Sequence, residues 1–99
     1  MRVEEAQHIG FLLKKYTGNR SEVEVLLNLG SSTGDFRKVQ QPQIQENIFS
    51  PLEGLAYRVI HFDLKSEEGI DISGDIFDLE TQYRLKKVKP TIVMCCNLL

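Results

Sequence analysis

The sequence predicts an α/β protein in which helices cover both faces of a parallel sheet. Apolar runs of strand length are separated by helices or by long crossings along the chain. Parallel strands need such crossovers, and right-handed crossovers predict the strand order 3-2-1-4. The chain has 99 residues, enough for one small domain, and its apolar fraction of 41% is ordinary for a globular core.

The first predicted element is an amphipathic helix over residues 3–17, because apolar side chains recur there at helical spacing. These side chains are Ala6, Ile9, Leu13 and Tyr16. Gly18 is the expected C-cap of this helix. Residues 23–29, VEVLLNL, alternate at first and are then almost continuously apolar, which predicts the first strand.

The next segment is predicted to be mostly irregular. A short helix is expected from Gly34 to Val39 or Gln40, stopped before Pro42. The polar stretch QQPQIQENIFSPLEG is predicted to be a long connection with one helical turn around residues 44–49.

The second half is predicted to contain three strands and one helix. The strands are RVIHF at 58–62, IDIS at 70–73 and TIVMCC at 91–96. The helix is expected to begin at the cap residue Asp78 and to end at Pro90. Its inner face is predicted to use Leu79, Tyr83 and either Leu85 or the stem of Lys86.

Composition excludes several classes of function. The net charge is −2 and the pI is about 5.6, so the chain has no basic stripe of the kind that binds nucleic acid. No apolar run approaches the roughly 20 residues that span a bilayer. The acidic N-terminal stretch is unlike an export signal, and the adjacent cysteines 95 and 96 are expected to be reduced thiols without zinc-site spacing. These features favour a cytoplasmic protein with no metal site.

Polar residues follow each of the four predicted strands. Gly30 to Gly34, the stretch GSSTG, ends the first strand, while Asp63, Asp75 and Asn97 follow the second, third and fourth. The carboxyl ends of parallel strands meet at one edge, which is where open α/β sheets bind ligands. Small residues there let a ligand approach the backbone closely. The stretch fits neither the dinucleotide fingerprint nor a P-loop.

The stretch NLGSSTG resembles the first motif of the class I S-adenosylmethionine-dependent methyltransferases, with Asn28 at the acidic position and Ser32 at the middle glycine. VIHFD, IDISGDI and TIVMCCNLL resemble the second, third and fourth strands of that family, in the family's order. The resemblance covers residues 23–99 and implies a Rossmann-like fold.

The family's roles imply a set of cofactor-binding positions. Asp63 would hold the ribose hydroxyls and Asp75 the adenine amine of S-adenosylmethionine, because carboxylates accept hydrogen bonds from both groups. The full implied set is Asn28, Gly30, Ser31, Ser32, Thr33, Gly34, Asp63, Leu64, Asp75, Ile76 and Asn97. Methyl transfer needs alignment more than a special nucleophile, so no catalytic residue is assigned and the methyl acceptor is left open.

The complete family fold has seven strands, so the chain is interpreted as a truncated, cofactor-binding half. Residues 1–20 form the N-terminal helix and linker, and residues 21–99 form the partial domain. The chain alone is expected to lack catalytic activity, and either to self-associate through its fourth strand or to be marginally folded. Two alternatives are a non-catalytic Rossmann-like interaction module and, with less support, a fragment of a nicotinamide-dependent oxidoreductase.

Overall fold

The computed structural model describes residues 1–17, 24–55 and 57–95. Its core is a four-stranded parallel sheet in the order β3-β2-β1-β4, which confirms the predicted topology. The strands are β1 (Glu24–Leu29), β2 (Tyr57–Asp63), β3 (Ile72–Ser73) and β4 (Ile92–Met94). The predicted cap Gly18, the start of the first strand at Val23 and the domain boundary at 20/21 lie outside the described residues.

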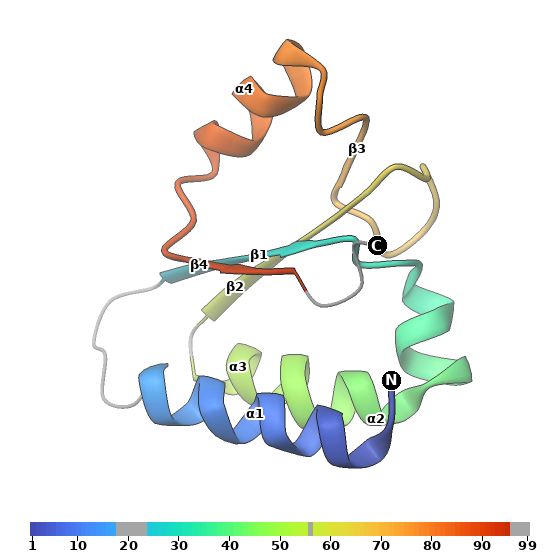
Figure 1. Cartoon of the computed structure of the whole chain (residues 1–99), viewed down its shortest axis with the longest axis vertical. Coiled ribbons are helices and arrows are strands. Elements are labelled where there is room, and N and C mark those ends of the chain that lie inside the picture. Colours follow the sequence, from blue (N-terminus) through green and yellow to red (C-terminus); the bar gives the residue numbers. More distant parts are fainter. Residues whose placement is uncertain (18–23, 56, 96–99) are drawn as a thin grey trace.

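Alternating side chains of the sheet fill two apolar cores, one on each face. Leu26 of β1 packs with α1 (Val3–Thr17) and with the helical segment between β1 and β2. Its neighbour Leu27 points to the opposite face and packs with Leu85 of α4 (Leu79–Lys87). Figure 1 shows α1 on one side of the sheet and α4 (orange) on the other. The expected two-sided covering is therefore present.

The segment between β1 and β2 is far more helical than predicted. After η1 (Phe36–Gln40), it continues as α2 (Pro42–Ile44), η2 (Gln45–Phe49) and α3 (Ser50–Gly54), where η marks π-helical turns. Ile44, Ile48 and Leu52 recur at intervals of four residues and are buried. Pro42 stands at the start of this helical run, where a missing N–H costs little, and Pro51 directly follows the π-helical turns of η2. The polar segment from Pro42 to Gly54 is therefore an amphipathic helix.

Helix α4 begins after Asp78, as predicted, but it presents a different face to the sheet. Leu79 and Tyr83 are 80% and 60% exposed. Leu85 is buried, which confirms that part of the prediction, and Thr81, one turn earlier, is buried with it. The prediction that Leu79 and Tyr83 face the sheet was wrong. It assumed that the larger apolar side chains point inward, whereas the helix places the small Thr81 against Gly74.

The third strand is shorter than the predicted 70–73. A side-chain oxygen of Asp71, Oδ2, accepts the His61 backbone N–H at 2.8 Å, and only Ile72 and Ser73 pair with β2 as a strand. Within the described chain, no helix is long and apolar enough to cross a membrane.

Candidate functional site

The loop at the carboxyl end of β1 is fixed by hydrogen bonds to β2. Gly30 has a φ of +71°, a conformation that favours glycine. The Ser31 N–H then donates to the Phe62 carbonyl at 2.9 Å, which extends the β1–β2 contact. Ser32 also has a positive φ, +58°, and its N–H donates to Asp63 Oδ2 at 2.7 Å. The Asp63 carboxylate therefore lies against the loop that follows β1.

The end of the loop packs against a second loop, which joins β2 to β3. The Gly34 N–H donates to the Glu68 carbonyl at 3.0 Å, and a side chain on Gly34 would meet the Cα of Gly69 at 3.3 Å. Thr33 Oγ1 accepts the Phe36 N–H at 3.1 Å, as a helix cap does. The small residue at position 34 is needed because another part of the backbone, not a ligand, lies against it.

A small cavity of about 170 Å³ opens on the other side of this loop, and we name it the edge cavity. Its lining comes from Gly30 after β1, from the end of β2 and from the turn after β3. The lining residues are Gly30, Phe62, Asp63, Leu64, Gly74, Asp75 and Ile76. The cavity therefore lies at the carboxyl edge of the sheet, where ligands of such sheets bind.

Two carboxylates from different strand ends flank the edge cavity. Asp63 is half-buried. Its Oδ1 accepts a hydrogen bond from the Lys65 N–H at 3.3 Å, and its Oδ2 accepts one from the Ser32 N–H. Asp75 is exposed, and its Oδ1 accepts the Phe77 N–H at 2.9 Å. These backbone bonds orient both carboxylates, and each oxygen retains lone-pair capacity for a further donor.

The structure brings only part of the predicted site together. Gly30, Asp63, Leu64, Asp75 and Ile76 line the edge cavity. Ser31 and Ser32 shape the loop through their backbone groups, while Thr33 and Gly34 line a different cavity. Asn97 lies outside the described residues.

Asn28 is buried within the sheet, paired with His61 on the neighbouring strand. The two residues are register partners, and Asn28 Nδ2 lies 3.2 Å from His61 Nδ1. The Phe49 ring and the imidazole pack in a T-shaped arrangement, with ring centroids 4.8 Å apart. Burial, assisted by the positive charge of Arg37, lowers the pKa of His61 to about 4. His61 is thus neutral at pH 7, and its Nδ1 can accept the amide hydrogen of Asn28.

Arg37 is a residue of the site that is absent from the predicted cofactor-binding set. It is only 2% exposed, and its guanidinium donates to the carbonyls of Ser32 and Gly69, both at 2.7 Å, and of Ser31 at 3.3 Å. Burial lowers the pKa of Arg37, while nearby carboxylates, Asp71 foremost, act in the opposite direction. Its position one helical turn after Gly34 could have signalled this contact, because residues three apart share a helix face.

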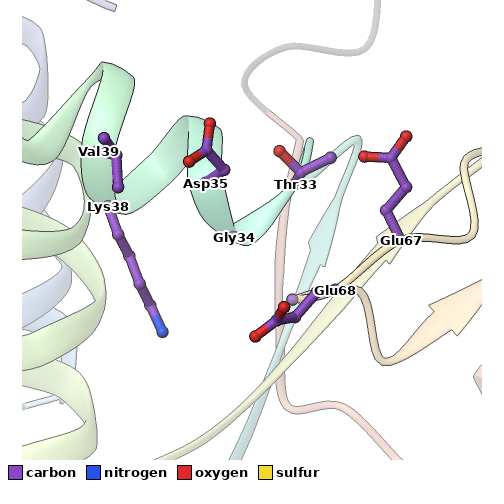
Figure 2. A pocket seen from close by; sticks show the side chains of 8 residues that line it. Thr33, Gly34, Asp35, Lys38, Val39, Glu67 and Glu68 are labelled. Carbon is purple, nitrogen blue, oxygen red and sulfur yellow. The ribbon is translucent and has the colours of Figure 1, made fainter.

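A second cavity, of about 420 Å³, lies between the start of the η1 segment and the β2–β3 loop. Figure 2 shows Thr33, Asp35 and Lys38 on one wall and Glu67 and Glu68 on the other. Asp35 Oδ2 is already bonded to Gln40 Nε2 at 2.8 Å. Among the described residues, no group of three potential metal ligands is placed to hold an ion. Charged residues of both signs line this cavity, which is open to solvent.

The edge cavity combines apolar walls with two carboxylates that backbone N–H groups orient. Comparison with models of known protein families, with curated proteins and with solved structures gave no match for this chain. Because a fold alone does not define a function, the residues of the site must indicate it.

Proposed function

We propose that this chain is a Rossmann-like, methyltransferase-like domain of the cytoplasm that binds S-adenosylmethionine in the edge cavity. One observation carries the proposal: Gly30, Asp63 and Asp75, which stand at the carboxyl ends of three different strands, line a single cavity at the carboxyl edge of the sheet. The sequence resemblance assigned these three positions to one cofactor.

The chemistry of each wall matches a part of the nucleoside. The Asp63 carboxylate can accept hydrogen bonds from a ribose diol, and its charge strengthens them. Asp75 can accept the adenine amine, while Leu64 and Ile76 offer apolar contact to the ring. Gly30 presents backbone without a Cβ, so the methionine part of the cofactor can pass close to the chain.

The reaction supported by such a site is transfer of the sulfonium methyl group to an acceptor. An in-line displacement of this kind depends mainly on holding the two reactants in alignment. In this proposal the described residues bind and orient the nucleoside, and the methyl acceptor is left open.

Calorimetric titration with S-adenosylmethionine tests the proposal. Asp63→Ala should weaken binding by roughly 1.5–3 kcal/mol, the range for hydrogen bonds to a charged group. Asp35→Ala is the matched control, because it removes an equal charge from the other cavity. We expect that control to keep the affinity of the unmodified chain. Equal affinities for all three proteins would remove Asp63 from the site, and the absence of any binding would reject the cofactor.

A second candidate function, a non-catalytic interaction module, is favoured by a different observation. β4 pairs only with β1 in the described sheet, so it is an edge strand. Unpaired backbone groups on such an edge can recruit another strand. This candidate predicts association without S-adenosylmethionine binding, which the same titration distinguishes.

A further inference from the structure

The buried guanidinium of Arg37 joins the two loops that border the proposed cofactor site. Nη1 donates to Ser31 and Ser32 in the loop after β1, and Nη2 donates to Gly69 in the loop after β2. In the described part of the chain, Nε is buried without a hydrogen-bond partner. The hydrogen bonds of this buried charge all go to carbonyl oxygens, its carboxylate neighbours act on it only through space, and one N–H is unsatisfied, so Arg37 is a poor means of stabilising a core. A role in shaping the loops accounts for it better.

The Ser32 residue is held from both of its backbone groups. Its N–H points to Asp63 Oδ2 and its carbonyl accepts from Arg37 Nη1, each at 2.7 Å. The carbonyl also accepts the Ser31 hydroxyl at 2.9 Å. These opposed bonds maintain the positive φ that a serine rarely adopts.

We infer that Arg37 is a positioning residue for the edge cavity: by clamping Ser32 and Gly69 it fixes the loop that orients Asp63 and leaves Gly30 open to a ligand. This inference rests on the proposed function for the identity of the ligand, S-adenosylmethionine. The clamp itself is a property of the chain without ligand. Arg37 has no place in the lining of the edge cavity, so it acts through Ser32 and Asp63.

The test combines amide hydrogen exchange by NMR with calorimetric titration of S-adenosylmethionine. Arg37→Gln removes the charge and the fork of donors, while Arg37→Lys keeps the charge and loses the fork. Lys38→Gln is the matched control, since it removes the same charge from the next, exposed position on the same turn. The Ser32 and Gly34 amides, which donate to Asp63 and Glu68, report on the loop. Amides of β1 and β2 report on the fold.

We expect Arg37→Gln to lose protection at Ser32 and Gly34 while the amides of β1 and β2 stay protected. Affinity for S-adenosylmethionine should fall roughly tenfold or more, and Arg37→Lys should show a smaller change in the same direction. Lys38→Gln should match the unmodified chain in both measurements.

Unchanged protection at Ser32 and Gly34 in a folded Arg37→Gln or Arg37→Lys protein would overturn the inference. Unfolding of both variants would also overturn it, because Arg37 would then support the whole fold. If the unmodified chain fails to bind S-adenosylmethionine, the proposed function falls, and the exchange measurement alone decides the clamp.

Discussion

At the scale of single residues, Ser32 adopts a backbone conformation that glycine prefers. Its φ of +58° brings its N–H to Asp63, and a Cβ makes this conformation unfavourable. Ser32→Gly should therefore stabilise the fold by about 0.5–1 kcal/mol. Ser32→Ala, which keeps the Cβ, should give no such gain. Urea unfolding of the three proteins measures the difference, and a glycine variant less stable than the alanine variant would contradict it.

His61 predicts how stability depends on pH. Its pKa is lowered to about 4 in the fold, from an ordinary value of 6.5, so between these values the unfolded chain binds more protons. Stability should fall as the pH drops through this window, by up to about 3 kcal/mol from this group. His61→Gln should flatten the curve of unfolding free energy against pH. Equal slopes for both proteins between pH 7 and pH 4.5 would show that His61 does not titrate in this way.

The convergence of two acidic residues could be predicted at this scale, because residues at the carboxyl ends of parallel strands meet at one edge of the sheet. The structure places Asp63 and Asp75 beside one cavity, as their positions after parallel strands predicted. Gly34 was misleading, since a glycine that meets a ligand and one that meets Gly69 look alike in sequence. The sequence likewise does not show whether Asn28 meets a ligand or another side chain, because its partner His61 is 33 residues away along the chain.

At the scale of elements, the segment from Pro42 to Gly54 shows where sequence reasoning failed. Two prolines and a run of glutamines indicated an irregular connection, yet the buried apolar residues follow helical spacing. Pro42 begins the helical run and Pro51 follows the π-helical turns of η2, so neither proline ends the helix. The π-helical turns shift the spacing further, which local patterns do not reveal.

The contact between α1 and η2 gives an element-scale prediction. A Cβ on Gly10 would collide with the backbone carbonyl of Asn47. Gly10→Ala should therefore destabilise the fold by about 1–3 kcal/mol, although alanine is the better helix former. Gly54→Ala is the control, because no atom lies within 4 Å of its added Cβ. Thermal unfolding compares the two, and a stabilised Gly10→Ala protein would mean that α1 does not pack on η2 as described.

At the scale of the whole molecule, the strand order followed from the sequence because few parallel topologies obey the rules for crossovers. The order places β4 at one edge of the described sheet, where Val93 is 55% exposed. Apolar edge strands favour pairing with a second copy of the chain. We expect a concentration-dependent dimer by sedimentation, weakened by Val93→Lys. Val39→Lys, at a valine that is 69% exposed on η1, should leave it intact. A monomer at every concentration would refute pairing through β4.

The edge cavity is the proposed nucleoside site for S-adenosylmethionine, and an NMR titration of the unmodified chain with this cofactor tests it most directly. Binding is followed through the backbone amide shifts. We expect saturable shifts concentrated at Gly30, Asp63 and the turn Gly74–Ile76, with little change at Asp35 and Lys38 in the other cavity. Saturable shifts confined to the other cavity, or no shifts at millimolar cofactor, would contradict a nucleoside site at this edge of the sheet.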